Sequence, residues 1–360
     1  MKSISRYKVI GAMSGTSLDG LDLVYCEFIR SGKKWSFKLK ASQTVRYSRQ
    51  WQKRLALAHL LSGEKLQLLD IGYGVFIGDC CNKFRRKNEL RVVNFIASHG
   101  HTIFHQPENR LTFQLGNGGA INSTTGLPVV NDFRSIDVLK GGQGAPLVPV
   151  GDHLLFSAYD ICLNLGGIAN LSRIEGGKRT AFDICFVNMG LNHLAAKLGK
   201  KYDKSGKEAS IGDVDKKMLN SLNGAYAKWR KKRPSLGREG FEEYIEPIIE
   251  DEAVPIRDRL RTFCESIAIE ISKSMAAKKK KKKSVLATGG GALNSFLIKL
   301  IADKLGPQFK VTVPASEIIN YKEAIVFALL GILRTRNETN ILKSVTGAES
   351  DSSGGVMTGF

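Results

Sequence analysis

Residues 8–28 read Lys8-Val-Ile-Gly-Ala-Met-Ser-Gly-Thr-Ser-Leu-Asp-Gly-Leu-Asp-Leu-Val-Tyr-Cys-Glu-Phe28. The apolar runs 8–12 and 21–28 are typical of strands, and the stretch between them is a turn rich in small residues. A strand, a polar glycine turn and a second strand predict a β-hairpin in this part of the chain.

The same order of elements returns about 150 residues further along the chain. Ile161–Leu165 is a buried-strand pattern that continues through Gly166 and Gly167 into the strand pattern Leu171–Ile174. This spacing indicates two similarly folded halves, and a length of 360 residues fits about two domains.

Glycine turns follow predicted strands at three places, 15–20, 166–167 and 289–291. Glycine lets backbone N–H groups approach an anion closely, and successive amides make an anion-binding concavity. One such turn has a structural interpretation, but three of them favour a nucleotide site. Neither a Walker pattern nor a Gly-x-Gly-x-x-Gly pattern after a strand is present.

Polar side chains beside the first turn strengthen the nucleotide interpretation. Thr16 and Ser17 add hydroxyl donors. Asp19 and Asp22 do not bind phosphate directly, but they can hold Mg²⁺, usually through water.

The composition argues against several classes of protein. No stretch approaches the roughly 20 apolar residues of a membrane span, and the longest candidate is Ala324–Leu333. Residues 1–7 are polar and basic and the apolar run after them breaks at Gly11, so no signal peptide is expected. The six cysteines form no Cys-x-x-Cys pair, which predicts reduced thiols in a cytoplasmic enzyme.

The basic excess is concentrated in two segments. The chain has 54 Lys and Arg against 34 Asp and Glu, a formal net charge of +20. Residues 197–238 and 273–283 hold most of the excess, including the unbroken run Lys278–Lys283. The run is interpreted as a solvated loop between a helix and a strand. The alternative is a patch for nucleic acid or a membrane surface, although few aromatic side chains interleave to stack on bases.

Three histidines lie close together in Ser98-His-Gly-His-Thr-Ile-Phe-His105. His99 and His101 are expected to share one face of a strand, where they could chelate a metal. The alternatives are hydrogen bonds within a loop and hydrogen bonds to a substrate. A substrate role is favoured over a metal because no nearby Cys, Asp or Glu completes a tetrahedral set.

A charged pair precedes the Gly-rich segment 141–147. Arg134 and Asp137 beside such a loop suit recognition of a sugar or a carboxylate, because Arg offers a planar fork of donors. A purely structural Arg–Asp pair is the alternative.

Asp183 ends a short predicted strand, and Asn188 opens the helical pattern 189–198. A carboxylate at a strand end that faces a cleft can act as a general base. On spacing alone, a helix-capping carboxylate is an equal alternative. Cys185 is expected to be a buried small side chain, because no nearby His argues for a nucleophile.

Apolar spacing predicts the remaining elements. The chain is expected to form helices over 51–61, 66–86, 261–277, 293–305 and 321–336, strands over 92–98 and 285–287, and a loop or tail over 347–360.

Seven segments together resemble the anhydro-N-acetylmuramic acid kinase family. They occur in the family's order and cover nearly the whole chain, and the first of them is highly specific. They are Met13-Ser-Gly-Thr-Ser-Leu-Asp-Gly-Leu-Asp22, Ser98-His-Gly-His-Thr102, Asp132-Phe-Arg134, Gly141-Gly-Gln-Gly-Ala-Pro-Leu147, Asn164-Leu-Gly-Gly-Ile-Ala-Asn170, Gly289-Gly-Gly-Ala-Leu-Asn294 and Ser344-Val-Thr-Gly-Ala348.

The resemblance implies the α/β fold that sugar kinases share with actin and the 70-kDa heat-shock proteins. Two ribonuclease-H-like domains, 1–132 with 345–360 and 133–344, would flank an ATP cleft. The implied enzyme is a phosphotransferase with an alcohol group as acceptor. It would convert ATP, water and 1,6-anhydro-N-acetylmuramic acid into N-acetylmuramic acid 6-phosphate and ADP, in amino-sugar catabolism and peptidoglycan recycling. ATP and Mg²⁺ are the implied cofactors, a homodimer is possible, and neither a membrane nor nucleic acid is the expected partner.

The family's functional residues carry over to matching positions of this chain. Asp183 matches the catalytic aspartate, which would take a proton from the water that attacks the anomeric carbon while O6 receives the γ-phosphoryl group. Asp19 would hold Mg²⁺ through water. The implied ATP-binding residues are Gly15, Thr16, Ser17, Leu18, Asp19, Gly20, Leu21, Asp22, Gly166, Gly167, Asn170, Gly289, Gly290 and Gly291. The implied substrate-binding residues are His99, Arg134, Asp137, Gln143, Asn188, Arg238 and Glu323.

Some positions depart from the family's pattern. After Asp183 the commoner Thr-Gly-Pro-Gly-Asn is replaced by Ile184-Cys-Phe-Val-Asn188, Asn117 stands where many relatives have Asp, and His101 replaces a Gln. The altered segment 184–187 keeps open a kinase of the same fold that acts on another sugar. The net charge keeps open a nucleic-acid-binding protein or an inactive relative reused for binding.

Overall fold

The structure is a computed structural model that describes residues 4–15, 18–275 and 282–360. It divides into two compact units, Met1–Ser157 with Tyr321–Phe360, and Ala158–Asn320. The residues after 132 stay with the first unit, where Asp137 accepts a hydrogen bond from Thr346 Oγ1 at 2.7 Å. The domain boundaries 132/133 and 344/345 stay a prediction.

The first unit is built on a six-stranded sheet with the order β13-β7-β4-β1-β2-β3. β1, β2 and β3 form an antiparallel meander, whereas β4 runs parallel to β1 and β7 runs parallel to β4. A separate hairpin pairs β5 with β6. The strands are β1 (Ile4–Ser14), β2 (Gly20–Ser31), β3 (Lys34–Arg46), β4 (Phe95–Ser98), β5 (His101–Gln106), β6 (Leu111–Leu115), β7 (Val129–Asn131) and β13 (Val356–Thr358).

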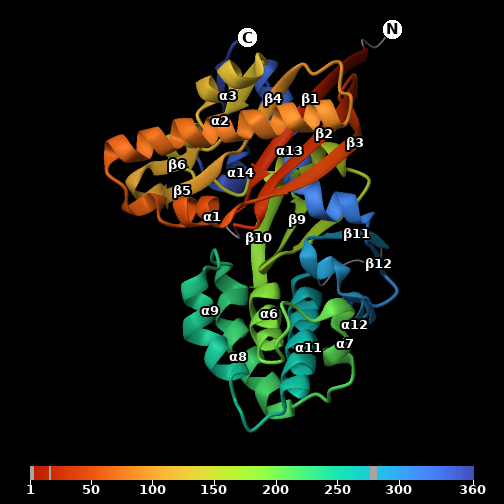
Figure 1. The fold of residues 1–360 in the computed structure, drawn as a ribbon. Coiled ribbons are helices and arrows are strands. Elements are labelled where there is room, and N and C mark those ends of the chain that lie inside the picture. Colours follow the sequence, from red (N-terminus) through yellow and green to blue (C-terminus); the bar gives the residue numbers. More distant parts are fainter. Residues whose placement is uncertain (1–3, 16–17, 276–281) are drawn as a thin grey trace. The chain divides into compact units, whose positions relative to one another are not determined.

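Helices cover both faces of this sheet (Figure 1). On one face Tyr73 of α2 lies in a buried cluster with Ile10 and Leu23. Successive strand residues point to opposite faces, and on the other face a Cβ at Gly11 would lie 2.2 Å from the Ala324 carbonyl oxygen of α13. The helices are α1 (Arg49–Ala56), α2 (Gly63–Lys87), α3 (Gly118–Thr125), α4 (Ser135–Leu139), α5 (Val148–Leu155), α14 (Lys343–Thr346), most of α13 (Ser316–Thr335), and the 3₁₀ turns Ala58–Leu60 and Pro107–Asn109.

The second unit is built on a five-stranded sheet with the order β10-β9-β8-β11-β12. β8, β9 and β10 form an antiparallel meander, whereas β11 runs parallel to both β8 and β12. Gly176 and Gly177 both have positive φ and form the two-residue turn between β9 and β10. The strands are β8 (Ile161–Leu165), β9 (Ile168–Glu175), β10 (Lys178–Phe186), β11 (Lys283–Thr288) and β12 (Phe309–Thr312).

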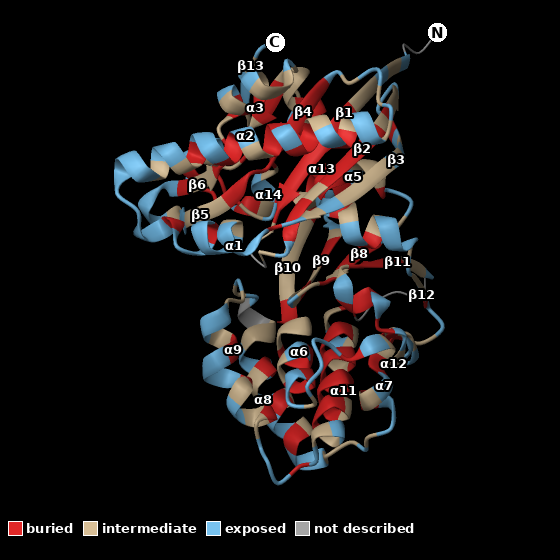
Figure 2. Ribbon diagram, viewed as in Figure 1, coloured by how far each residue is buried: buried red, intermediate tan, exposed pale blue. Residues whose placement is uncertain are grey.

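The long helix α11 organises the core of the second unit. Its residues Phe263 and Ile267 are fully buried in one cluster with Leu163 of β8 and Ile301 of α12, and Figure 2 shows how much of α11 is buried. The helices are α6 (Asn188–Ala196), α7 (Lys207–Ser210), α8 (Lys216–Lys232), α9 (Arg238–Tyr244), α10 (Glu246–Ile249), α11 (Ile256–Met275), α12 (Ser295–Leu305), and the 3₁₀ turns Lys204–Gly206 and Gly290–Leu293.

The two sheets share one topology. Each has a three-stranded antiparallel meander whose first strand is also flanked by a parallel strand, followed by another parallel strand, in the orders β3-β2-β1-β4-β7 and β10-β9-β8-β11-β12. Both predicted glycine-turn hairpins are the first hairpin of their sheet. The predicted α/β protein with two ribonuclease-H-like folds is therefore confirmed.

The structure bears on two polar segments of the chain, the C-terminal residues and the lysine run. The tail predicted over 347–360 is not entirely irregular, because Val356–Thr358 forms β13 and pairs with β7. Three residues are too few for apolar alternation to reveal a strand, so the partner edge decides it. Of the lysine run, Lys278–Lys281 lie outside the described residues.

The cysteines agree with the prediction of reduced thiols. All six are buried and none forms a disulfide, and burial raises the pKa of the Cys185 thiol well above its usual value. As expected, Cys185 is a buried small side chain. Among the helices that the structure describes, none has the length and apolarity needed to cross a membrane.

Candidate functional site

The turn between β1 and β2 carries the predicted phosphate site of the first unit. Thr16 and Ser17 lie outside the described residues. Asp19 is exposed, whereas Leu21 is fully buried in the core, so any contact of Leu21 with a nucleotide would come from its backbone. Gly20 is required by packing, because a Cβ there would lie 2.5 Å from the Val45 carbonyl oxygen of β3.

Carboxylates gather beside this turn. Asp22 accepts a hydrogen bond from Thr44 Oγ1 at 2.6 Å, and burial raises its pKa, with Glu323 and Asp19 raising it further. Glu323 is an exposed residue of α13. The protein around its carboxyl group still removes part of its hydration, which raises the pKa of Glu323 against the opposing effects of Arg134 and Lys322. Carboxylate oxygens are the donors that a hard cation such as Mg²⁺ takes.

A chain of hydroxyl groups lies at the base of the same turn. Tyr47 donates to Ser14 Oγ at 2.7 Å, Ser14 Oγ lies 2.9 Å from His101 Nδ1, and the Tyr73 and Tyr47 hydroxyls are 2.5 Å apart. Burial lowers the pKa of His101 to about 4, so its ring is neutral at pH 7 and Nδ1 can accept. The donors then run in one direction from Tyr73 to His101. The sequence alone does not reveal this series of hydroxyl groups, because no local pattern links residues so far apart.

Tyr47→Phe is expected to lower the free energy of unfolding by about 1–3 kcal/mol, because Tyr73 and Ser14 each lose a buried partner. The ring and its packing stay in place. Urea denaturation of the full chain measures the change, with the exposed Tyr202→Phe as the matched control. Equal stability of the two variants would show that this series of hydroxyl groups contributes nothing to the free energy of unfolding.

His99, Arg134 and Asp137 organise the Gly-rich loop. Arg134 donates from Nε to His99 Nε2 at 2.9 Å and from Nη1 to the Gly144 carbonyl oxygen at 2.6 Å. The Gly144 N–H donates to Asp137 Oδ2 at 2.7 Å. The predicted pair thus holds both backbone groups of Gly144. Gln143 has an exposed side chain, and its N–H donates to the Thr346 carbonyl oxygen at 2.8 Å.

The expectation that His99 and His101 share one face of a strand is wrong. β4 ends at Ser98 and β5 begins at His101, because Gly100 has a φ of +74° and breaks the strand between them. Nδ1 of His99 lies 3.0 Å from the Gly100 carbonyl oxygen and its Nε2 accepts from Arg134, so both ring nitrogens are engaged. Burial lowers the pKa of His99 well below its usual value. Hydrogen bonding at the strand end replaces metal chelation.

Asp183 lies within β10 rather than at its end, three residues before Phe186. Asp183 pairs directly opposite Asn170 in the register that starts at the β9–β10 turn, and the pairing shifts by one residue only after it, between Asp183 and Cys185. Its Oδ2 accepts from the Leu236 N–H at 2.9 Å, and burial raises its pKa against the opposing effect of that bond. It caps no helix.

Asp183 lines a pocket of about 100 Å³ in the second unit. Trp229, Pro234 and Arg233 contribute to the same pocket, and the Arg233 guanidinium lies 3.9 Å from the centroid of the Phe182 ring. A partly desolvated carboxylate in a pocket has the environment of a general base.

The other predicted residues of the second unit meet at the ends of β8 and β11. Asn188 donates from Nδ2 to the Leu165 carbonyl oxygen at 3.0 Å, and its N–H donates to the Gly166 carbonyl oxygen at 3.1 Å. Gly289 has a φ of +80°, and a Cβ there would lie 2.8 Å from the Leu165 carbonyl oxygen. A Cβ at Gly291 would likewise lie close to Leu165, 3.0 Å from its carbonyl oxygen. This strand end is therefore too tight for any other residue at 289.

The structure sets the remaining predicted residues apart. Arg238 is exposed at the start of α9 and pairs with Glu242 at 2.6 Å. The altered segment 184–187 is buried, and the Phe186 and Val187 N–H groups donate to Tyr226 Oη and the Gly167 carbonyl oxygen. The side chains that replace the family's small residues thus fill the core.

Asp70 is a further buried carboxylate that sequence reasoning did not single out. It accepts from the Gly116 N–H at 2.7 Å and from Asn117 Nδ2 at 3.2 Å, and burial raises its pKa. Asn117 also caps α3 by accepting from the Ala120 N–H at 3.0 Å. An aspartate at 117 could not donate to Asp70, which gives the departure from the family's pattern a physical reason.

One His–Glu cluster in the second unit resembles a metal site by proximity. The ligand atoms of His193, Glu246 and Glu250 lie within 4.8 Å of one another. However, His193 directs Nδ1 to Glu246 and Nε2 to Glu250, and Lys197 lies 2.9 Å from Glu250. Both ring nitrogens of His193 already have partners within the cluster, which is a hydrogen-bonded group joined to the Lys197–Glu250 ion pair.

Comparisons with known proteins identify relatives along nearly the whole chain. The family model described as anhydro-N-acetylmuramic acid kinase matches residues 7–359. Anhydro-N-acetylmuramic acid kinase of Francisella tularensis subsp. novicida is 35% identical, covering 96% of this chain and 97% of that protein. The enzyme of that name from Mannheimia succiniciproducens is 32% identical, covering 97% and 98%.

One solved structure superposes over most of the chain at lower identity. Component A of the (R)-2-hydroxyglutaryl-CoA dehydratase of Acidaminococcus fermentans superposes with a TM-score of 0.46 at 12% identity, covering 90% of this chain and 96% of that chain. The sequence relatives and the family model thus carry the assignment. The chain belongs to the anhydro-N-acetylmuramic acid kinase family.

Proposed function

We propose that this chain is an ATP-dependent kinase that opens 1,6-anhydro-N-acetylmuramic acid with water and phosphorylates O6. The products are N-acetylmuramic acid 6-phosphate and ADP, and the reaction belongs to cell-wall recycling. The observation that carries the proposal is Asp183, a partly desolvated carboxylate in a pocket of a chain of this family.

Asp183 acts as the general base. It accepts a proton from the water that attacks the anomeric carbon, and the bond from that carbon to the bridging oxygen breaks. The leaving O6 forms its new bond to the γ-phosphorus of ATP, and the bond from that phosphorus to the β–γ bridging oxygen breaks to release ADP. The Leu236 N–H holds the carboxylate, and the raised pKa makes it a stronger base than an exposed aspartate.

Residues of the first unit bind the phosphates. The backbone of Gly15, Leu18 and Gly20 serves the nucleotide, with Thr16 and Ser17 adding hydroxyl donors. Asp19 holds Mg²⁺ through water, with Asp22 and Glu323 adding negative charge. When bound, the ion neutralises charge on the β- and γ-phosphates.

Glycine turns and strand ends of the second unit serve the nucleotide as well. Their proposed members are Gly166, Gly167, Asn170, Gly289, Gly290 and Gly291. The Gly166 and Gly167 carbonyl oxygens accept hydrogen bonds from the N–H groups of Val187, Asn188 and Met189. The N–H groups of the two glycines are the ones proposed to donate to an anion.

Sugar-binding side chains are proposed in each unit separately. Arg134 donates from Nε to His99 and from Nη1 to Gly144, so Nη2 is the nitrogen proposed to reach the substrate. Asp137 is fully buried and supports the loop. Arg233 in the Asp183 pocket suits a sugar that carries a carboxylate. His99, Gln143, Asn188, Arg238 and Glu323 complete the proposed set.

A coupled assay of ADP release tests this function. ADP should appear with ATP, Mg²⁺ and 1,6-anhydro-N-acetylmuramic acid, and not without the sugar. A panel of other sugars tests specificity, including N-acetylmuramic acid without the anhydro bridge and an anhydro sugar without the lactyl carboxylate. Turnover of another sugar alone would replace the proposed substrate, and no sugar-dependent ADP at all would contradict a kinase.

The rate is also expected to depend on the protonation of Asp183. A base must be deprotonated, so kcat/KM should fall as the pH drops through a pKa that burial has raised above 3.8. The acid limb should therefore begin at a higher pH than an exposed aspartate would give. A pH profile of the wild type and of the residual activity of Asp183→Asn measures it, and a limb that persists unchanged in the variant assigns it to another group.

A further inference from the structure

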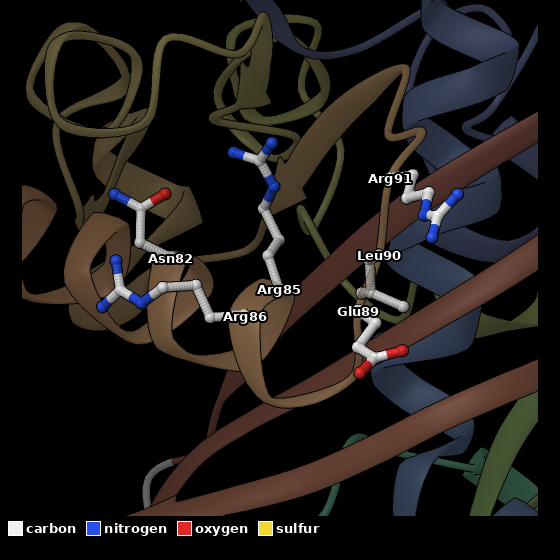
Figure 3. A pocket seen from close by; sticks show the side chains of 6 residues that line it. All are labelled: Asn82, Arg85, Arg86, Glu89, Leu90 and Arg91. Carbon is white, nitrogen blue, oxygen red and sulfur yellow. The ribbon is translucent and has the colours of Figure 1, made fainter.

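A basic pocket lies at the C-terminal end of α2 in the first unit. It has a volume of about 510 Å³ and is lined by Asn82, Arg85, Arg86, Glu89, Leu90 and Arg91. Figure 3 shows Asn82, Arg85 and Arg86 on the last turns of α2, and Glu89, Leu90 and Arg91 on the segment that follows. Three arginines and one glutamate line it, outside the two segments in which the sequence concentrates its charge.

The arginines are not explained by the need to cap α2. The carbonyl oxygens of Phe84, Arg85 and Arg86 already accept from the backbone N–H groups of Asn88, Leu90 and Glu89, at 3.2, 3.0 and 3.2 Å. Asn88 Nδ2 adds a bond to the Phe84 carbonyl oxygen at 2.9 Å. Cations at a helix C-terminus interact favourably with its dipole, but these three carbonyl groups already have backbone donors.

Arg85 has an unsatisfied donor at this pocket. Its Nε is buried and, within the part of the chain that the structure describes, has no hydrogen-bond partner. A buried charged donor without an acceptor is costly. Asn82, which also lines the pocket, donates from Nδ2 to the Thr124 carbonyl oxygen at 2.9 Å.

We propose that this pocket binds a small phosphate-bearing anion, at a site separate from the predicted nucleotide turns. Guanidinium groups present planar forks of N–H donors that match phosphate oxygens. Arg85 supplies the buried donor, while the exposed Arg86 and Arg91 supply charge from either side of the helix end. The volume is that of an ordinary small-molecule site.

Isothermal titration of the full chain with inorganic phosphate and pyrophosphate tests the site, with acetate as the carboxylate arm. Arg86→Gln/Arg91→Gln should raise the Kd for phosphate about tenfold or more, because two charged donors are removed. The matched control is Lys53→Gln/Lys65→Gln, which removes the same charge at exposed positions of α1 and α2. Glu89→Gln should lower the Kd. The KM for ATP should not change in Arg86→Gln/Arg91→Gln.

The outcomes separate this site from other causes. Equal weakening in the lysine control, or equal binding of acetate, would reduce the effect to net charge and overturn the proposal. A rise in the KM for ATP together with the Kd would place the phosphate at the nucleotide turns. Crystals soaked in selenate should show anomalous scattering beside Arg85. A peak there without binding in solution would mean an adventitious ion only, which also overturns the proposal.

Discussion

In Asp183→Asn, kcat for sugar-dependent ADP release is expected to fall about 10²–10⁴-fold while the fold is retained. Asparagine keeps the shape of the side chain, and its Oδ1 can still accept from the Leu236 N–H. It cannot take the proton of the attacking water. The substitution also removes a charge that burial disfavours, so the free energy of unfolding should stay equal or rise.

The matched control for this prediction is Asp303→Asn. Asp303 is exposed on α12 in the same unit, so its substitution tests the loss of one carboxylate without the pocket. Saturating single-turnover and steady-state assays measure kcat for both variants, and urea denaturation measures their stability. Turnover of Asp183→Asn at the wild-type rate would remove Asp183 from the role of base and leave the family assignment intact.

Gly11→Ala is expected to lower the free energy of unfolding by about 3 kcal/mol or more. The added Cβ would lie 2.2 Å from the Ala324 carbonyl oxygen and 3.0 Å from Val24 Cγ2. The nearest atom belongs to the backbone of α13, so relief requires the helix to move away from β1. Because the nearest atom is a backbone atom, rotation of a side chain cannot relieve this contact.

Gly72→Ala is the control with the opposite sign. Gly72 lies on the exposed side of α2, and a Cβ there would have nothing within 4 Å. Alanine favours a helix interior over glycine by about 0.5–1 kcal/mol, so this variant should be slightly more stable than the wild type. Urea denaturation of both variants gives the comparison. A Gly11→Ala protein as stable as Gly72→Ala would contradict the close approach of α13.

Local patterns were enough to predict the hairpins and most helices. The first hairpin was expected from apolar runs 8–12 and 21–28, and the structure extends them to Ile4–Ser14 and Gly20–Ser31. The α2 prediction over 66–86 likewise falls within Gly63–Lys87. Such elements are readable because apolar alternation and helical periodicity repeat over many residues.

The candidate site was predictable as a set of residues and not as an arrangement. Asp183 was expected at the end of a strand, but β10 continues to Phe186 and Asp183 pairs opposite Asn170 inside it. Arg134 and Asp137 were expected as a pair, but each binds a backbone group of Gly144 instead. Spacing cannot reveal these details, because many partners satisfy the same donor or acceptor.

The sequence by itself determined the repeated hairpin, the reduced thiols and the motifs of the kinase family. Only the tertiary structure decided that Ser14 meets His101, 87 residues away, and that Val356–Thr358 completes the sheet beside β7. The reason is physical. Hairpins and helices are specified by neighbours along the chain, whereas a buried hydroxyl or a free strand edge is satisfied by whichever distant group the packed core brings within bonding distance.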